Sequence, residues 1–320
     1  MNSSNRFIDR LLHSSAQAVR PALRTGLWIL VITIPISLGV LLLKLTGLLH
    51  VIARLCGPLF SWLGLPGESA LVFVTAGLVN IYACIALIET LGLTGRTVTI
   101  LALMCLISHS LAVESAVQKK TGTSFSLIMV VRLCASFAGA FALNLLLPPD
   151  SQQQVLAGGY GTLATAGLWV ELKAWALTVA VLCVKILILI TLLMILQRIL
   201  EEFGVIQWVS RFLKYPLMVF GLPRQAAFLW IVANTLGLAY GAGVIIDYVE
   251  RGRLSRKHAD ILNYHIAVSH SLLEDTLLFV AIGASIGWIT IPRVILAGIV
   301  VWIKRGIERW WLRDRGAVVP

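Results

Sequence analysis

Two short polar motifs interrupt strongly apolar segments of this chain, and each combines imidazole, hydroxyl and carboxylate groups. A shift of 161 positions carries the first motif onto the second, with an aspartate replacing a glutamate. Such residues are costly inside a membrane and usually serve function there. We therefore expect two related halves that share one substrate- or ion-binding site. Its candidate residues are Ser108, His109, Ser110 and Glu114 in the first half, and Ser269, His270, Ser271, Glu274 and Asp275 in the second.

Imidazole and carboxylate groups suit either metal coordination or proton relay. His270 and Glu274 are four residues apart, so on a continuous helix they share a face and could ligate Fe²⁺, Mn²⁺ or Zn²⁺. Val113 stands in the first half where Glu274 stands in the second, which leaves a symmetric metal site incomplete. A packing role for His270, bonded to a neighbouring carbonyl, is the structural alternative.

Charged partners accompany the two carboxylates. Glu114 and Asp275 are candidates to carry a coupling proton or cation, as intramembrane carboxylates do in transporters. Arg132 and Arg293, related by the same shift of 161, each follow on the next predicted helix. They either neutralise the carboxylates by charge pairing or face an anionic substrate. The sequence leaves both roles open.

Enzyme chemistry is not expected from these motifs. A serine next to a histidine points to a different side of its helix, so Ser108 and His109 do not form a nucleophile–base pair. Neither Gly-x-Ser-x-Gly nor His-Glu-x-x-His occurs, and no nucleotide-binding Gly-x-x-x-x-Gly-Lys-Ser/Thr is present. We predict a protein that is not an enzyme and requires no cofactor.

Composition indicates which elements must position the motifs. The 320 residues are 58% hydrophobic and 13% charged, and several apolar runs approach the length of about 20 residues that crosses a bilayer. The net charge of +11 comes from basic residues at both termini and between apolar segments. This distribution is typical of cytoplasmic loops under the positive-inside rule, not of a nucleic-acid-binding protein. The chain is predicted to be an all-α polytopic membrane protein.

The order of segments repeats in the two halves. Each half is expected to hold three spanning helices, one interfacial helix and one Gly- or Asn-containing apolar segment that folds as a re-entrant hairpin. The predicted parts are a basic amphipathic surface helix at 1–25; a first repeat at 26–147 with spans 26–49, 96–117 and 124–147, interfacial helix 51–64 and hairpin 66–92; a periplasmic linker at 148–171; a second repeat at 172–305 with spans 172–200, 258–283 and 288–303, interfacial helix 205–221 and hairpin 223–249; and a basic cytoplasmic tail at 306–320.

Charge distribution favours an inverted relation between the halves. With re-entrant hairpins each half crosses three times, and the basic loops and both termini then lie in the cytoplasm of a bacterial inner membrane. If the hairpin segments crossed instead, the halves would be parallel, with a cytoplasmic linker lacking any lysine or arginine. Asn80 and Asn234 lie inside the two hairpin segments, and interrupted apolar segments at matching positions indicate a transporter site.

These hairpin segments resemble a known membrane domain. Gly64-Leu65-Pro66-Gly67-Glu68 leading to Asn80, and Gly221-Leu222-Pro223 leading to Ala233–Leu238, are similar to the Gate or nucleoside recognition domain. That domain occurs in spore maturation proteins A and B, in the membrane part of ferrous-iron transporter B and in concentrative nucleoside transporters. The resemblance covers 65–147 and 222–305, and it implies inverted repeats, re-entrant hairpins and a midplane substrate site. The Gly-Gln-x-Glu-x-Pro signature of the nucleoside transporters is absent.

We therefore expect an inner-membrane secondary transporter that moves a small polar or ionic solute by alternating access, coupled to protons or cations. One alternative is a divalent-metal permease using His270 and Glu274. Another is a non-transporting membrane protein that assembles with a partner. The expected partners are the lipid bilayer, a small-molecule or ion substrate, and a second copy or a partner membrane subunit.

Overall fold

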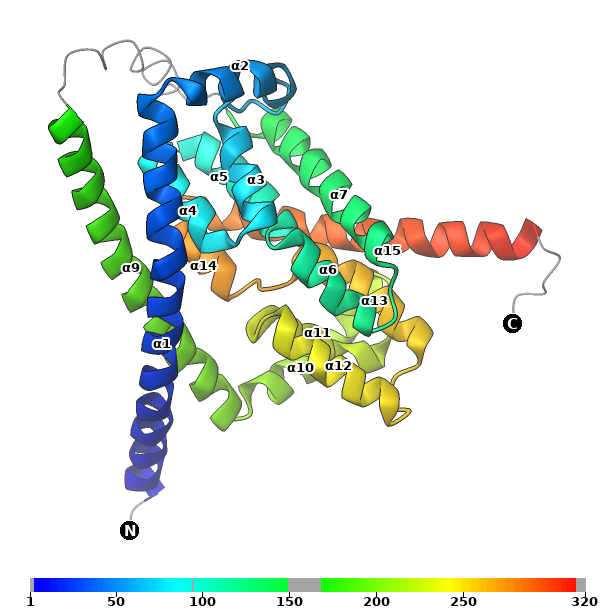
Figure 1. Ribbon diagram of the computed structural model, residues 1–320. Helices are drawn as coiled ribbons and strands as arrows, with labels where there is room; N and C mark the ends of the chain where they lie inside the picture. The colour runs from blue at the N-terminus through cyan, green and yellow to red at the C-terminus, as the bar shows by residue number, and fades with distance from the viewer. Residues whose placement is uncertain (1–2, 94, 149–167, 315–320) are drawn as a thin grey trace.

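The computed structural model describes residues 3–93, 95–148 and 168–314, and all regular elements within them are helices. Two long helices, α1 (Ser3–Leu45) and α9 (Leu168–Glu202), pack against each other and run antiparallel along one edge of the molecule (Figure 1). Gly26 permits their contact, because a Cβ there would lie 2.5 Å from Leu187 Cδ2. Small residues of this kind allow helices to approach closely in membranes.

The boundaries of these long helices differ from the prediction. Residues 3–25 do not form a separate surface helix but continue without interruption into the first span as α1. At the other end of the chain α15 (Ile286–Asp314) extends helically through much of the expected tail at 306–320. Most of the predicted linker, 149–167, lies outside the described residues, and α9 already begins at Leu168.

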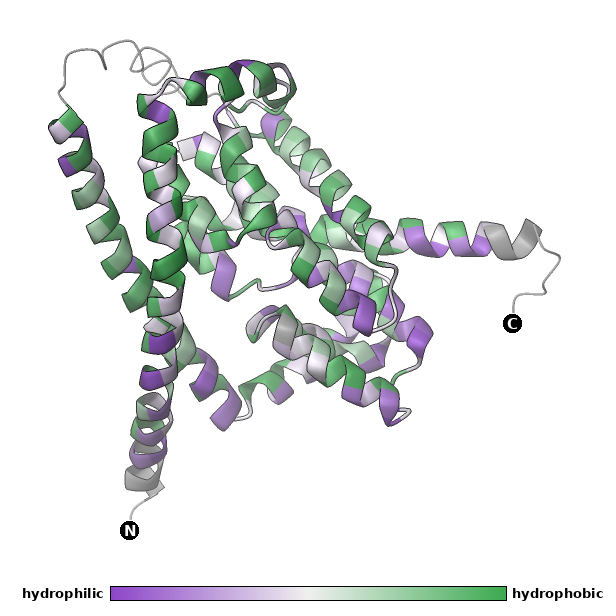
Figure 2. Cartoon of the chain, in the orientation of Figure 1, coloured by the Kyte–Doolittle hydropathy of each residue, from purple (hydrophilic) through white to green (hydrophobic). Residues whose placement is uncertain are grey.

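Among the described residues, five helices are long and apolar enough to cross a membrane. They are Asp9–Leu45, Gly95–Lys120, Phe125–Leu146, Leu168–Glu202 and Ile286–Trp310, which correspond to five of the six predicted spans. Hydropathy follows the same pattern, since apolar residues cover the midsections of α1 and α9, and polar residues gather at the N-terminal part of α1 and the C-terminal end of α9 (Figure 2). The chain is an α-helical membrane protein.

In the first half of the chain, a helical hairpin comes after α1 and the short helix that follows it. Its two helices, α3 (Ser69–Leu78) and α4 (Ile81–Thr90), have ten residues each and pack against each other. Ten residues span about 15 Å, roughly half the thickness of a bilayer core. The two ends of this segment meet, because Arg96 Nη1 donates to Gly64 O at 3.2 Å. The chain therefore leaves the hairpin close to the point where it entered.

A second hairpin occupies the matching position in the second half. After the 3₁₀ turn η2 (Arg224–Ala226), α11 (Ala227–Thr235) packs against α12 (Leu238–Glu250). The contact is close, since a Cβ on Gly241 would lie 2.8 Å from Ala233 Cα. Amphipathic helices precede the hairpins in both halves: α2 (Leu48–Ser61) and α10 (Val205–Val219) lie at opposite ends of the molecule (Figure 1).

The polar motifs break the helices that carry them. The predicted span 96–117 consists of α5 (Gly95–Ser108) and α6 (Leu111–Lys120), and the predicted span 258–283 consists of α13 (Arg256–Ser269) and α14 (Glu274–Val280). At the breaks, Ser110 and Ser271 adopt left-handed backbone angles, with φ of 44° and 52°, and they are the only described non-glycine residues with positive φ. Each broken helix then packs against the next helix, α5 against α7 (Phe125–Leu146) and α13 against α15.

Candidate functional site

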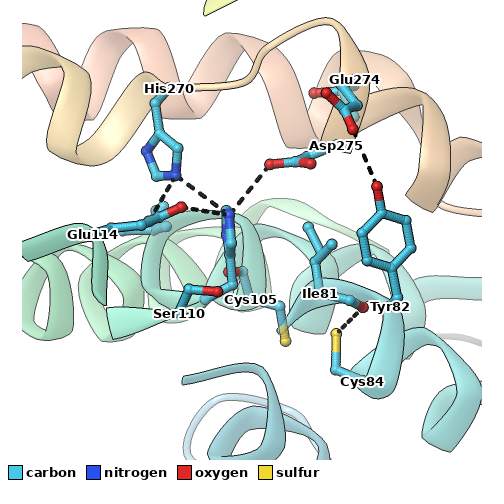
Figure 3. A network of polar contacts seen from close by, with 12 residues as sticks. Ile81, Tyr82, Cys84, Cys105, Ser110, Glu114, His270, Glu274 and Asp275 are labelled. Atoms are coloured by element: carbon cyan, nitrogen blue, oxygen red, sulfur yellow. Dashed lines mark hydrogen bonds and ion pairs between the residues drawn. The ribbon is translucent and has the colours of Figure 1, made fainter. Parts of the chain in front are cut away.

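The two helix breaks face each other in the interior of the protein, and they bring the two motif histidines into contact (Figure 3). His109 Nε2 lies 3.4 Å from His270 Nε2, and the ring centroids are 4.9 Å apart. Both rings are buried. Residues 161 positions apart in the sequence are thus adjacent in space.

Hydrogen bonds to the backbone orient both imidazoles. His109 Nδ1 is 3.2 Å from Cys105 O, and His270 Nδ1 is 2.9 Å from Ile266 O, each four residues back along the preceding helix. A carbonyl oxygen only accepts hydrogen bonds, so in both rings the hydrogen lies on Nδ1. In the neutral rings the lone pairs on Nε2 then point at each other across the interface between the halves.

Two carboxylates approach the same nitrogen atoms. Glu114 places Oε1 3.1 Å from His109 Nε2 and Oε2 3.1 Å from His270 Nε2. Asp275 Oδ2 lies 3.3 Å from His109 Nε2. Each histidine therefore contacts the carboxylate of the opposite half, His109 with Asp275 and His270 with Glu114. We call these four residues the central cluster.

The central cluster has an excess of acceptors. Ionised carboxylates and the Nε2 atoms of neutral imidazoles all accept hydrogen bonds, and none of them donates. Converging acceptors repel one another in a buried environment, where electrostatic interactions are strong. Arg132 offsets part of this repulsion at Glu114 Oε2, and a proton or a metal cation among these atoms would offset the rest. Binding a positive charge is the chemistry that this geometry favours.

Two fully buried arginines fix the broken helix ends. Arg132 donates through Nε to Ile107 O at 2.7 Å and through Nη2 to His109 O at 2.8 Å. Arg293 donates to Val268 O at 3.3 Å and to His270 O, the carbonyls at the corresponding positions of the second half. Carbonyls at helix C-termini lack intrahelical donors and carry partial negative charge, which the guanidinium groups satisfy.

The predicted charge pairing holds differently in the two halves. Arg132 Nη2 contacts Glu114 Oε2 at 2.6 Å, so this arginine also neutralises its carboxylate. Arg293 Nη1 donates to Thr276 Oγ1 at 3.3 Å, beside Asp275. The Glu114 carboxylate is thus shared between an arginine and both histidines, whereas Asp275 faces His109.

The serines of the motifs have backbone roles. Ser110 N donates to Ala76 O at 2.8 Å and Ser271 N donates to Ala233 O at 3.3 Å, which ties each break to the tip of the hairpin in its own half. The other two serines donate to main-chain carbonyls, Ser108 to Arg132 O at 3.2 Å and Ser269 to His265 O at 3.1 Å. These contacts position the histidines between them.

The predicted hairpin asparagines also act on the backbone. Asn80 lies at the tip of the first hairpin and caps α4 by accepting from Ala83 N at 2.8 Å. Asn234 lies in the last turn of α11, where its side-chain Nδ2 donates to Trp230 O at 2.8 Å. The main-chain carbonyl of Asn234 accepts from Leu273 N at 3.1 Å. Both residues shape the elements around the central cluster rather than contacting its four side chains.

Glu274 does not join the central cluster, which corrects the expected His270–Glu274 metal pair. That pair assumed one continuous helix, but α13 ends at Ser269 and α14 begins at Glu274, so the two residues share no helix face. Glu274 instead accepts from Tyr82 Oη at 3.1 Å (Figure 3). It also accepts from Gln197 Nε2 at 3.2 Å. The structure groups His270 with His109 and Asp275, whose ligand atoms lie within 4.8 Å of one another.

Sequence reasoning missed Tyr82 and Gln197. Gln197 also donates to Thr235 O at 2.9 Å and lines a pocket of about 380 Å³ between α1, α9 and the second hairpin, together with Arg198, Leu236 and Tyr240. A lone amide near the end of a long apolar run was the available signal for Gln197, because such a residue needs a polar partner inside the protein. Tyr82 carried no comparable signal.

Comparison with known proteins gives one informative match. Over 290 residues the chain is 31% identical to the uncharacterized membrane protein YvoD of Bacillus subtilis (strain 168), and the match covers 89% of this chain and 91% of that protein. No family model matches the chain. No solved structure matches it.

Proposed function

Because the chain belongs to the same family as the Bacillus subtilis membrane protein YvoD, we propose a function that requires a bilayer. The protein is an inner-membrane secondary transporter for a small polar or ionic solute. The central cluster binds a cation, which is either the coupling ion or the transported solute itself. The observation that carries this proposal is the convergence of acceptor atoms from His109, His270, Glu114 and Asp275 at one buried point. The cluster contains residues of both halves, so binding or release of a cation there would change the interaction between the halves and favour their relative movement.

The surrounding architecture supports transport over a purely structural role. Broken helices and short hairpins place non-helical backbone beside the buried cluster, and such backbone inside membranes is tolerated only within protein or beside a watery cavity. Discontinuous helices at matching positions of two halves are typical of transporter sites. The resemblance to Gate-domain proteins, proposed from the glycine- and proline-containing segments, agrees with this arrangement.

An inverted relation between the halves is part of the proposal. The antiparallel course of α1 and α9 and the opposite positions of α2 and α10 support it (Figure 1). Alternating access then arises when one half moves against the other around the cluster, with both termini on the cytoplasmic side. Labelling cysteines introduced at Gln153 and Arg253 tests this orientation. Outside labelling at 153 alone is expected, and labelling at 253 alone would overturn the inverted arrangement.

Transport itself is tested with the double variant Glu114→Gln with Asp275→Asn in liposomes. We expect uptake driven by a proton or cation gradient to be lost while the protein still elutes as a folded species. Asp275→Asn alone provides a gentler variant, because Arg293 hydrogen-bonds Thr276 and helix carbonyls and keeps those partners. Glu89→Gln, at the far end of the first hairpin, is the matched control and should retain transport.

A membrane assembly partner would behave differently in the same experiment. Such a protein should tolerate the double variant and complement a deletion strain without any solute movement in liposomes. Gradient-dependent transport that survives loss of both carboxylates would remove the coupling role of the cluster. The two outcomes are separable because complementation and liposome uptake are measured independently.

A further inference from the structure

We propose that the cation of the central cluster is a divalent first-row transition-metal ion, held by Nε2 of His109, Nε2 of His270 and a carboxylate oxygen of Asp275. This inference rests on the proposed function, since it names the cation that the cluster binds. Glu114 lies against the same nitrogen atoms, with Oε1 near His109 and Oε2 near His270.

The spacing of the ligand atoms fits such an ion. Bonds of about 2.0–2.2 Å from a tetrahedral metal to nitrogen and oxygen place neighbouring ligand atoms roughly 3.3–3.5 Å apart. Two of the three separations match this value, 3.4 Å between the two Nε2 atoms and 3.3 Å from His109 Nε2 to Asp275 Oδ2, and all three ligand atoms lie within 4.8 Å of one another.

The outer hydrogen bonds of the histidines have the form found around metal sites. Metal-binding histidines donate their other ring nitrogen to a carbonyl or carboxylate, which fixes the tautomer and turns the remaining lone pair to the metal. Both histidines do this here, toward Cys105 O and Ile266 O. The same device at two positions related by 161 residues orients both lone pairs to one point.

Charge and donor type narrow the ion further. Glu114 and Asp275 bring two negative charges to the site; Arg132 also contacts Glu114 Oε2 at 2.6 Å, whereas Arg293 is bonded to helix carbonyls and Thr276. Two imidazoles with carboxylate oxygen suit Mn²⁺, Fe²⁺, Co²⁺ or Zn²⁺, whereas Mg²⁺ and Ca²⁺ prefer oxygen alone and Cu⁺ prefers sulfur. We assign the site to this borderline class.

The test is titration of the purified, detergent-solubilised full-length chain with Co²⁺, whose visible absorption reports the coordination of the bound ion, followed by displacement with Zn²⁺. We expect one ion per chain, and loss of the signal in His109→Ala, His270→Ala and Asp275→Asn. Glu274→Gln is the matched control, because this neighbouring carboxylate faces Tyr82 and Gln197 and should leave binding unchanged.

Three outcomes separate this inference from the proposed function. Absence of Co²⁺ and Zn²⁺ binding in the folded wild-type chain overturns the metal assignment. If that chain still shows proton-driven transport in liposomes, the proposed transport function stands without the metal. Equal loss of binding in Glu274→Gln also overturns the assigned ligand set. Specific binding without movement of the ion or of any solute in liposomes retains the metal site and removes the transport function.

A separate observation concerns how the central cluster is reached. We infer that water and small cations pass between it and the surface that carries Lys119 through a file of buried polar residues between α6 and α13, which we call the polar file. Its buried members are Ser115, Gln118, Thr121, Thr123 and Asn263, and it ends at the partly exposed Asp260.

Direct hydrogen bonds link most of the polar file. Gln118 Nε2 donates to Asn263 O at 3.1 Å, and Asn263 Nδ2 donates to Thr121 Oγ1 at 2.6 Å and to Thr123 Oγ1 at 2.8 Å. Thr123 Oγ1 then donates to Asp260 Oδ1 at 2.7 Å. At one end Ser115 adjoins Glu114 in sequence, and at the other Thr121 lines a surface pocket of about 270 Å³ with Lys119 and Arg256.

Polar atoms along this file remain unpaired within the described protein. Ser115 Oγ, Gln118 Oε1 and Asn263 Oδ1 are buried and have no hydrogen-bond partner there. Buried polar groups are paired in native proteins, commonly by ordered water. Three such atoms in succession between the cluster and a basic surface pocket indicate a hydrated route.

Thiol labelling tests the polar file in a background whose five native cysteines are replaced. A small hydrophilic reagent applied from the Lys119 side should label Asn263→Cys. It should leave Ala102→Cys unlabelled, although residue 102 corresponds to residue 263 by the shift of 161 and is equally buried. Equal labelling of both positions, or no labelling of Asn263→Cys in a chain that still elutes as a folded species, overturns the route.

Discussion

The broken helices of the two halves differ most in the segments that approach the motifs. In α5 every residue from Ile100 to Ile107 is fully buried and apolar, whereas the matching stretch of α13 contains Asn263 and His265. Beyond the breaks the halves agree again, in the left-handed serines, the backbone-bonded histidines and the carbonyl-bound arginines. The halves are thus similar in the backbone around the helix breaks and differ in the helices that lead to them, α5 and α13.

This contrast separates two physical requirements. Interrupting a helix inside a membrane exposes carbonyls that must find donors, and each half meets this need with a buried arginine. Access to the central cluster at any one time requires a polar route from only one side of the protein. The apolar α5 and the polar α13 therefore correspond to a cluster that is reached along α13 and closed along α5. The symmetric residues build the site, and under the proposed route through the polar file the asymmetric residues would determine its accessibility.

Replacing the two arginines should break the apparent symmetry most strongly. Arg132→Met removes the helix cap and also leaves Glu114 as a buried charge without its arginine, which should lower the free energy of unfolding by about 3–5 kcal/mol. Arg293→Met removes hydrogen bonds to carbonyls and Thr276 and should lower it by about 1–3 kcal/mol. Unfolding of the purified variants in detergent measures the difference.

The companion variant identifies the cause of that inequality. Adding Glu114→Gln to Arg132→Met removes the uncompensated charge, and it should recover part of the lost stability. Equal effects of the two single arginine variants would contradict the argument, because they would show that carbonyl capping alone accounts for both residues.

The sequence predicted the parts of this site that depend on repetition. The shift of 161 residues identified both histidines, both carboxylates and both arginines. The histidines and arginines bond corresponding backbone positions in the two halves, whereas the carboxylates have different partners. Helicity and five of the six spans followed from length and hydropathy. The helix breaks were not predicted, since a left-handed serine has no composition signal and Ser-His-Ser is compatible with a continuous helix.

Contacts across the halves lay beyond sequence reasoning for a different reason. The assumed pairing of His270 with Glu274 used spacing along one helix, but the actual neighbours of Glu274 come from α4 and α9. The i,i+4 rule applies only within an uninterrupted helix. Once the helix is broken, tertiary packing decides which carboxylate meets which histidine.

A second prediction sharpens the comparison at the contact between Tyr82 of the first half and Glu274 of the second. Tyr82→Phe removes one charge-assisted hydrogen bond and Glu274→Gln weakens two, to Tyr82 and Gln197, and each variant should lower the free energy of unfolding by about 1–2 kcal/mol. A double-mutant cycle should give a coupling of about 0.5–1.5 kcal/mol, because contacting residues are not additive. Full additivity would show that the contact does not join the halves energetically.

The last comparison concerns the left-handed serines, where the halves should respond alike and where replacement by glycine should have the smallest effect. A side chain in this conformation carries strain of about 1–2 kcal/mol. Glycine relieves this strain, but it also increases the conformational entropy of the unfolded chain, which offsets part of the gain. Ser110→Gly and Ser271→Gly should each change the free energy of unfolding by less than about 1 kcal/mol. Ser110→Val and Ser271→Val should both destabilise the protein by about 1–3 kcal/mol, since β-branched residues fit this conformation poorly. Thermal unfolding of the four variants measures the pairs, and opposite behaviour at 110 and 271 would mean that the two breaks are held by different backbone constraints despite their shared angles.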